Sequence, residues 1–494
     1  MRSLVIDLNN FSRYPTLPVG SLVAVLRASG IEVEVLSPLA RGVKGYPRLT
    51  RARLWGYARD RLSYWSAVST NGLVRAARDL AARTQQPGSS SDKEAVLRYA
   101  SEFLARSPDV VLISTYTQYR DICADLARLC RQRGIPVLIG GSYLVEPEIV
   151  ADFLALDGVS AVFSGEPEGV LADLVADLAH GRDPSRHAGV SVPGKRPAAP
   201  APPLRDLDRL PWPDYDDFPW GLYPNRIVPI LTGRGCGWGK CRFCGDIVTA
   251  SGRTFRSRSL EHVLGEIRAQ RERHGAELFV FLDLKLNSDL ALWRGLLERL
   301  PDAAPGASWT ASVHVDARTD NGLARDDVFQ ARRAGLARVT TGLETAGPDL
   351  LKRMAKGTST QRTAAFLRDA HEAGISTRLT AILGYPGETP ADIEATTAFL
   401  AAHGATIERV MLNRFTLMLG SELDLELQKE PSLGSGAPAV MRGAVQAATA
   451  VVAHANPALA ERGHRRAAGD LMRVVHRINR KRLTARALAF EGVM

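Results

Sequence analysis

The stretch GRGCGWGKCRFCGD, residues 233–246, holds three of the five cysteines in this 494-residue chain. It directly follows residues 226–232, an apolar run that predicts a buried β-strand. Helical segments then alternate with five more candidate strands, at residues 277–283, 308–313, 337–342, 376–383 and 407–413. Six strand–helix units predict an incomplete β/α barrel, and barrel active sites lie at the carboxyl ends of the strands. The cysteine loop is therefore expected at the active-site end of that barrel.

The first 185 residues carry a second alternating pattern. Continuous apolar runs such as SLVIDL (3–8), DVVLISTY (109–116) and IPVLIGGSY (135–143) are separated by helical segments. Such runs predict a parallel sheet with helices on both faces, whose ligands bind at the carboxyl ends of the strands. Small or polar residues stand at those ends and either let a ligand approach the backbone or simply form turns: Ser114, Gly140, Gly141, Ser142 and Glu166.

The expected fold class is α/β. Residues 1–185 are predicted to form a doubly wound, Rossmann-like domain with a helical insertion at about residues 40–107, which we interpret as a helical hairpin. Seven prolines between residues 191 and 213 mark a linker, placed at residues 186–225. The partial (β/α)6 barrel would span residues 226–423, and the alanine-rich residues 424–494, which lack a strand signal, are predicted to be a small helical domain.

Composition argues against several classes of protein. The first residues lack the apolar region of a signal peptide, no apolar run is long enough to span a bilayer, and five cysteines are too few for a disulfide framework. We therefore expect a cytoplasmic protein without a membrane partner. The net charge of +10 comes from short basic runs, which fit a solvated helix face better than a nucleic-acid interface.

Spacing narrows what the three loop cysteines can bind. The glycines around them miss both phosphate-binding patterns, GxGxxG and GxxxxGK[ST]. A structural zinc site needs a fourth ligand, for which His262 is the only candidate, and a ferredoxin site needs a fourth cysteine, which does not follow Cys244. Cys123 and Cys130, far upstream on a predicted helix, are interpreted as buried free thiols. Three thiolates on an iron–sulfur cluster would leave one iron free to bind a small molecule.

The chain resembles the cobalamin-binding class of the radical S-adenosylmethionine (SAM) superfamily over residues 1 to about 423. The resemblance rests on RGCGWGKCRFCGD (234–246), FVFLDLKLNSD (279–289), GLETAGPDLLKRMAKGTS (342–359) and GYPGETPADIEAT (384–396). Upstream, PDVVLISTY, IPVLIGGSY and VFSGEPEGVLADL are similar to the cobalamin domain of that class.

The resemblance implies three cofactors and the residues that hold them. It places a 4Fe–4S cluster on Cys236, Cys241 and Cys244, with SAM chelating the open iron. It implies SAM contacts from Phe243, Asp283 and Glu344. It implies a cobalamin site formed by Ser114, Gly140, Gly141, Ser142 and Glu166, where close approach of the corrin would leave no room for a large side chain at Gly141.

Two features depart from the pattern of the class. The loop spacing is C-x4-C-x2-C, whereas C-x3-C-x2-C is usual. The D-x-H-x-x-G motif that supplies a lower histidine to cobalamin is absent, and the nearest histidine is His180.

The implied activity is radical methyl transfer to an unactivated carbon, or to phosphorus, of a natural-product or peptide intermediate. The expected partners are a small-molecule or peptide substrate and an electron donor of the flavodoxin or ferredoxin type. No residue is assigned a catalytic role. Two alternatives stay open: a radical rearrangement, cyclisation or ring contraction without methyl transfer, and, from another class, a zinc-stabilised basic nucleic-acid-binding protein.

Overall fold

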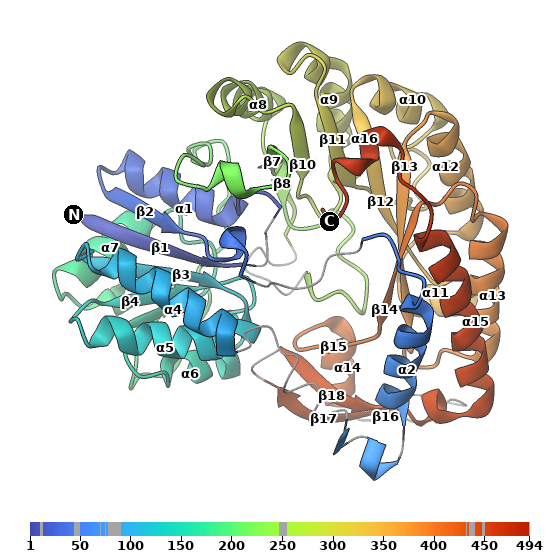
Figure 1. Ribbon diagram of the computed structural model, residues 1–494, viewed down its shortest axis with the longest axis horizontal. Helices are drawn as coiled ribbons and strands as arrows, with labels where there is room; N and C mark the ends of the chain where they lie inside the picture. Colours follow the sequence, from blue (N-terminus) through green and yellow to red (C-terminus); the bar gives the residue numbers. More distant parts are fainter. Residues whose placement is uncertain are drawn as a thin grey trace.

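The computed structural model describes residues 1–9, 13–43, 50–69, 71–74, 76–77, 90–246, 254–430, 432–433, 440–446 and 450–493. Two six-stranded sheets form the body of the molecule, one at each side of the view in Figure 1. The α/β fold class predicted from the sequence is thereby confirmed. No helix in the described ranges is both long and apolar enough to cross a lipid bilayer.

The N-terminal sheet has the order β2-β1-β3-β4-β5-β6, and only β6 runs antiparallel to its neighbour. Its strands are β1 (Arg2–Leu8), β2 (Glu32–Leu36), β3 (Val110–Thr115), β4 (Val137–Gly140), β5 (Ala161–Phe163) and β6 (Val190–Ser191). Alternate residues of each strand face opposite sides, so that β1 buries Val5 with α1 (Leu17–Ala28) and α7 (Leu171–Ala179). Leu4 and Ile6 pack on the other face with α4 (Ser90–Leu104), α5 (Arg120–Arg131) and α6 (Pro147–Leu154).

The second sheet is the partial barrel. Its six strands are all parallel and follow the order of the chain: β7 (Ile227–Ile230), β10 (Leu278–Phe281), β11 (Ser308–Ser312), β12 (Leu336–Glu344), β13 (Ser376–Leu383) and β14 (Arg409–Arg414). Each strand lies within two residues of its predicted bounds at both ends. The connecting helices are α8 (Leu260–His274), α9 (Leu290–Ala303), α10 (Arg325–Arg333), α11 (Pro348–Arg353), α12 (Thr360–Glu372) and α13 (Pro390–Ala402).

Tyr215, in the proline-rich segment between the sheets, joins their cores. The ring lies so close to α1 that a Cβ at Gly20 would be 2.3 Å from it. The Tyr215 hydroxyl donates to the Pro229 carbonyl of β7 at 3.1 Å. The same apolar cluster contains Val5 of β1 and Val228 of β7, so the two sheets share one continuous core.

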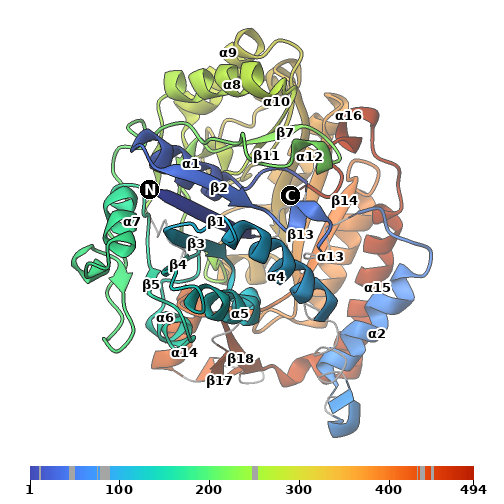
Figure 2. The same ribbon diagram turned by 60° about the vertical axis from the view of Figure 1, so that its left-hand side comes forward.

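The insertion is helical, but the hairpin interpretation is wrong. Helix α2 (Gly56–Val68) packs against α15 (Arg462–Asn479), whereas α4 packs against α5 and the N-terminal sheet. Figure 2 shows α2 beside α15, and in Figure 1 α2 and α4 lie on opposite sides of the view. The two helices separate because Tyr64 is buried with apolar residues of α15, while Val96 and Ala100 of α4 are buried under β1 and β3.

The prediction that residues 424–494 are helical is wrong in part. Helices α14 (Glu422–Lys429), α15 and α16 (Ala485–Leu488) are present, but four short strands form an antiparallel sheet in the order β15-β18-β17-β16. These are β15 (Leu417–Met418), β16 (Ser432–Leu433), β17 (Val440–Gln446) and β18 (Val451–Ala455). Their apolar residues are few and interspersed with alanine and glycine, so pairing with neighbouring strands rather than local pattern determines the structure.

Candidate active site

A cavity of ≈ 820 Å³ lies between the carboxyl ends of the two sheets. Every residue assigned to a site from the sequence lines it: Ser114, Gly140, Gly141, Ser142, Glu166, Cys236, Cys241, Phe243, Cys244, Asp283 and Glu344. Arg378, on β13, lines it as well. His180 does not, because its imidazole lies at the exposed end of α7 and contacts the Ala176 carbonyl.

The base of the cysteine loop is closed by a two-residue ribbon. Strand β8 (Gly233–Arg234) pairs antiparallel with β9 (Arg256–Ser257), and residues 247–253 of the loop lie outside the described ranges. Gly235 has φ +85°, and a Cβ there would be 1.8 Å from the Thr254 carbonyl oxygen. Only glycine fits this position, where the chain leaves the ribbon and enters the cysteine loop.

The loop is docked on the turn that follows α11. The Trp238 indole donates to the Ala355 carbonyl at 2.9 Å, and the Arg242 amide donates to the Met354 carbonyl at 3.1 Å. A Cβ at Gly357 would be 2.0 Å from the Trp238 ring, so that glycine makes room for the indole. On the other side, the Gly237 amide donates to Ser288 Oγ at 3.3 Å. These contacts fix both halves of the loop in the cavity wall.

None of the three loop cysteines forms a disulfide with another described residue, and all three line the cavity wall. The Cys244 amide donates to the Cys241 carbonyl at 3.2 Å, the tight turn expected from two intervening residues. Burial raises the pKa of Cys241 to about 11, although the Lys356 charge opposes the increase. Within the described ranges no three His, Cys, Asp or Glu side chains are arranged as a metal-ligand set, so the thiols line one cavity without forming such a set by themselves.

Asp283, just after β10, holds the start of the cysteine loop. One carboxylate oxygen accepts from Thr232 Oγ1 at 2.7 Å and from the Gly233 amide at 2.9 Å. The other oxygen accepts only from the Thr232 amide, at 3.1 Å. Burial raises the pKa of Asp283 to about 6 despite these hydrogen bonds. Asp283 is therefore destabilised when ionised, and one of its oxygens has spare acceptor capacity beside the cavity.

We predict that Asp283→Asn makes the protein without cofactors more stable at pH 7.5. The folded-state pKa of about 6 lies above the ordinary 3.8, so ionisation of Asp283 lowers stability as pH rises from 4 to 6. That difference corresponds to about 3 kcal/mol in the free energy of unfolding above pH 6. Urea unfolding should show the full gain at pH 7.5 and about half of it at pH 5. Equal stability of variant and wild type at pH 7.5 would contradict this account.

Glu344 ends β12 in a strained conformation. Its φ is +60°, uncommon for a residue with a side chain, and the pairing of β12 with β13 shifts register at this point. The carboxylate accepts from Lys356 Nζ at 2.9 Å and from Thr380 Oγ1 at 3.1 Å. Backbone strain that is held by specific contacts is typical of functional sites, and here it turns Glu344 and Lys356 toward the cysteine loop.

Phe243 lies between the last two loop cysteines and is half-buried. Its ring meets Tyr385 edge-on, with centroids 6.5 Å apart, and Lys356 Nζ lies 5.8 Å from its centroid. The ring therefore separates part of the cysteine turn from solvent.

Glu166 is fully engaged in ion pairs that join the two sheets. Its carboxylate contacts Arg256 at 2.8 Å and Arg234 at 3.1 Å, and it accepts from the Leu204 amide at 2.8 Å. Burial alone would raise the pKa of Glu166, but the two arginines and the Leu204 amide lower it below its ordinary value. Glu166 thus ties the N-terminal sheet to the base of the cysteine loop.

The remaining residues of the N-terminal side form a small polar rim. Asn9 donates to Ser114 Oγ at 2.9 Å and to Asp7, which places a further amide in the cavity wall. A Cβ at Gly141 would be 2.0 Å from the Thr115 carbonyl oxygen, whereas a Cβ at Gly140 would meet no atom within 4 Å. Gly141 is therefore required by the neighbouring strand, and Gly140 opens onto the cavity.

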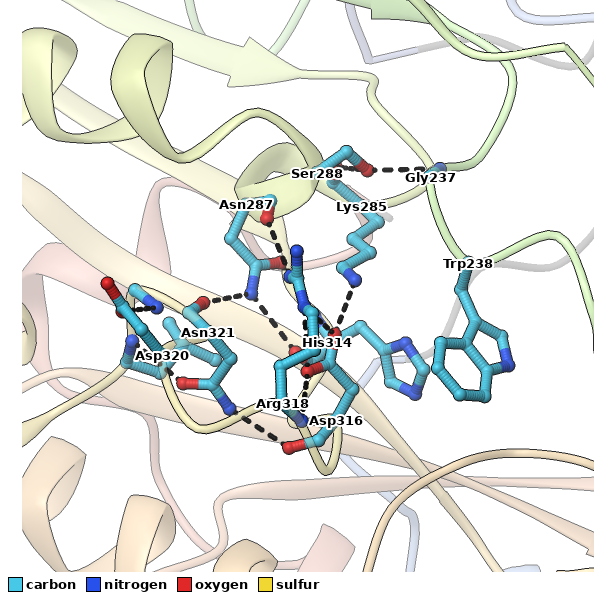
Figure 3. A network of polar contacts seen from close by, with 12 residues as sticks. Gly237, Trp238, Lys285, Asn287, Ser288, His314, Asp316, Arg318, Asp320 and Asn321 are labelled. Atoms are coloured by element: carbon cyan, nitrogen blue, oxygen red, sulfur yellow. Dashed lines mark hydrogen bonds and ion pairs between the residues drawn. The ribbon is translucent and has the colours of Figure 1, made fainter.

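Sequence reasoning missed a polar network beside the loop, shown in Figure 3. Lys285 and Asp316 form a buried ion pair, with 2.5 Å between Nζ and the carboxylate. His314 is held at its backbone by Asn287, and its ring packs edge-on against Trp238 with centroids 5.7 Å apart. Burial and the charges of Lys356 and Lys285 lower the pKa of His314 to about 3, so the imidazole is neutral. The one signal available was FLDLKLNSD (281–289), in which charged and polar residues, Lys285 among them, follow directly after an apolar strand.

His262 does not supply a fourth ligand to the loop cysteines. It lies on α8 and is not among the residues that line the cavity. Its Nδ1 accepts from Arg258 Nε at 3.0 Å and lies 3.3 Å from Asp208. Cys123 and Cys130 are buried free thiols on α5, as predicted, and burial raises the pKa of each to about 12.

Comparison with known proteins places this geometry in context. Residues 230–400 match the sequence profile of the Radical SAM superfamily. An uncharacterized methyltransferase from Pyrococcus horikoshii is 29% identical over 304 residues, which cover 59% of this chain and 64% of that protein. This chain therefore aligns with less than two thirds of that relative's length.

Two solved structures share the whole architecture. The radical SAM methyltransferase TsrM from Kitasatospora setae, solved with cobalamin and a [4Fe-4S] cluster, gives a TM-score of 0.66 at 18% identity, covering 96% of this chain and 89% of that chain. OxsB, a cobalamin-dependent SAM radical enzyme solved with aqua-cobalamin and SAM, gives 0.65 at 14% identity, covering 92% and 64%. At these identities the likeness shows the fold.

Proposed function

We propose that this chain, whose residues 230–400 match the profile of the Radical SAM superfamily, is a cobalamin-dependent radical SAM methyltransferase. The substrate would be an unactivated carbon, or phosphorus, of a small-molecule or peptide intermediate, and a flavodoxin- or ferredoxin-type protein would supply electrons. One observation carries the proposal: the three loop cysteines line the same cavity as the small residues at the strand ends of the other sheet. Both TsrM and OxsB share this two-sheet fold.

The residues present fit the three cofactors. Cys236, Cys241 and Cys244 supply the sulfur donors of a 4Fe–4S cluster, and their loop is anchored on both sides. The open space above Gly140 and the small rim of Ser114 and Ser142 suit a flat, bulky ligand such as cobalamin. When bound, the cluster supplies an electron that cleaves SAM, and cobalamin carries the methyl group that is transferred.

The chain's own side chains would bind and orient SAM. Asp283 has free acceptor capacity for an ammonium group, while its other bonds fix the entrance to the cysteine loop. The Glu344–Lys356 pair offers one acceptor and one donor on the neighbouring strand end. Phe243 and Trp238 cover the loop from two sides and keep water from the thiols. These roles are binding and orientation, and no proton transfer is assigned.

The ion pairs of Glu166 link the two sheets, and the proposed reaction requires such a link. A methyl donor on one sheet and a radical on the other must face the same substrate, so the two sheets must keep a fixed separation. Arg256 and Arg234, at the base of the cysteine loop, hold Glu166 and Glu168 of the N-terminal domain. Buried and bidentate arginine contacts of this kind fix geometry more strongly than exposed ion pairs do.

SAM carrying a deuterated methyl group tests the reaction. Anaerobically reconstituted protein with cobalamin and a reductant should form 5′-deoxyadenosine and S-adenosylhomocysteine. The S-adenosylhomocysteine should form only with cobalamin present, because cobalamin would accept the deuterated methyl group that leaves SAM. 5′-Deoxyadenosine without S-adenosylhomocysteine would overturn methyl transfer in favour of a rearrangement, cyclisation or ring contraction. Near-stoichiometric zinc without iron and sulfide would overturn the enzyme assignment and support the nucleic-acid-binding alternative.

A further inference from the structure

We infer that Lys285 presents a fixed positive charge to the cysteine loop and makes the iron–sulfur cluster held there easier to reduce. The inference rests on the proposed function, because it concerns the cluster assigned to the three loop cysteines. Lys285 would act on the cluster through its charge, as a positioning residue and not a ligand. Lys285 is part of the network of polar contacts drawn in Figure 3.

Lys285 is linked to the cysteine loop through Ser288. Ser288 Oγ accepts from the amide of Gly237, the residue after Cys236, and donates to the Lys285 carbonyl at 2.7 Å. One hydroxyl therefore connects the cysteine loop to the Lys285 backbone. Lys285, Cys236 and Cys241 all line the same cavity, and the Lys285 charge interacts favourably with the thiolate form of both cysteines.

The ammonium group is held in place and shielded from water. Its side chain is 2% exposed, and the side chain of its partner Asp316 is 0% exposed. Asn287 clamps the backbone of His314 on both sides, with its amide donating to the His314 carbonyl and its oxygen accepting from the His314 amide, each at 3.0 Å. Charges in such surroundings are screened far less by salt and solvent than surface charges are.

The Lys285 charge is not cancelled by its partner. Asp316 is shared, because its other oxygen accepts from Arg318 Nε at 3.0 Å. Two cations against one carboxylate leave a net charge of about +1 in this group. Lys356, another cation near the thiols, is balanced by Glu344, and His314 is neutral. Arg242 contacts Glu426, and Lys240 is exposed to solvent. The Lys285 group is therefore a buried source of unbalanced positive charge beside the loop.

A positive charge favours the more negative, reduced form of a cluster, because reduction adds an electron. Through an effective dielectric constant near 20, a charge about 12 Å from the cluster would change the equilibrium constant for reduction by about tenfold. For a one-electron couple, a tenfold change is about 59 mV. Lys285→Met should thus move the midpoint potential to more negative values, and Asp316→Asn should move it in the opposite direction.

The two directions separate an electrostatic role from structural damage. Each variant is reconstituted anaerobically with iron and sulfide, its iron and sulfide are measured, and its midpoint potential is determined by an EPR-monitored redox titration without SAM. Lys285→Arg keeps the charge and should keep the potential. Lys352→Met removes the charge of an exposed lysine on α11 and should shift the potential far less, because solvent screens it.

The outcomes distinguish this inference from the proposed function. Full cluster content with an unchanged potential in Lys285→Met, or a shift of the same sign in Lys285→Met and Asp316→Asn, would overturn the role of Lys285 and leave the cluster assignment intact. Wild-type protein that takes up no iron and sulfide would overturn both. If Lys285→Met does not fold, two variants still test the inference. The midpoint potential should stay unchanged in Lys285→Arg and become more positive in Asp316→Asn.

Discussion

Alanine in place of Cys236, Cys241 or Cys244 is expected to reduce iron and sulfide binding and 5′-deoxyadenosine formation to background. A three-cysteine site has no ligand to spare, because no further cysteine follows Cys244 in the sequence. The fold should persist, because the loop is held by backbone and side-chain bonds of Trp238, Arg242 and Gly237 that do not involve sulfur. Circular dichroism and iron–sulfide analysis of the three variants would check both expectations.

Cys123 provides the matched control. It is buried on α5, is not part of the cavity wall, and has the same side chain to lose. Cys123→Ala should retain the cluster and product formation while unfolding about 1 kcal/mol more easily, as small buried truncations do. A loop variant that keeps full iron and sulfide would refute the assignment of that cysteine.

The sheets could be predicted because a buried parallel strand is a continuous apolar run. Strand β13 coincides with its predicted residues 376–383, and the other barrel strands are offset by at most two residues. The order of strands along the barrel follows from strand–helix alternation, which joins each strand to the next one beside it. The placement of the cysteine loop at the carboxyl end of β7 follows from the same rule.

Contacts between distant segments could not be predicted. Glu166 was assigned to the cobalamin site. In the structure its carboxylate forms ion pairs with Arg234 and Arg256, which lie 68 and 90 residues further along the chain. The Lys285–Asp316 pair joins the ends of two neighbouring strands, and nothing in either segment alone indicates it. Pairing partners of this kind depend on the register of the folded sheet.

Gly141 has no room for a side chain, but the physical reason in the structure differs from the predicted one. The absence of a side chain was attributed to close approach of the corrin. The structure gives another reason, since the Thr115 carbonyl oxygen of the neighbouring strand would lie 2.0 Å from a Cβ at this position. A substitution at Gly141 therefore damages the sheet whether or not cobalamin binds, and the ligand must be tested one residue earlier.

We predict that Gly140→Leu abolishes cobalamin binding and leaves the fold and the cluster intact. A Cβ at Gly140 meets no atom within 4 Å, so a larger side chain projects into the cavity, where it would occupy the space a corrin needs. Retention of cobalamin, measured by its absorbance after gel filtration, should fall to background while iron and sulfide stay at wild-type content. Gly140→Ala, with one carbon in open space, should keep the cobalamin.

Gly141→Ala, in contrast to Gly140→Ala, is expected to destabilise the fold. Its single added carbon meets backbone of β3, which cannot rotate away, so we expect a loss of about 3 kcal/mol or more in the free energy of unfolding. Cobalamin would then be lost together with the sheet that holds it, and thermal unfolding would report both. If Gly140→Leu kept cobalamin at wild-type content, the rim formed by Ser114, Gly140 and Ser142 could not be the cobalamin site. The cavity would then serve the cluster and the substrate alone, and methyl transfer would need a different donor.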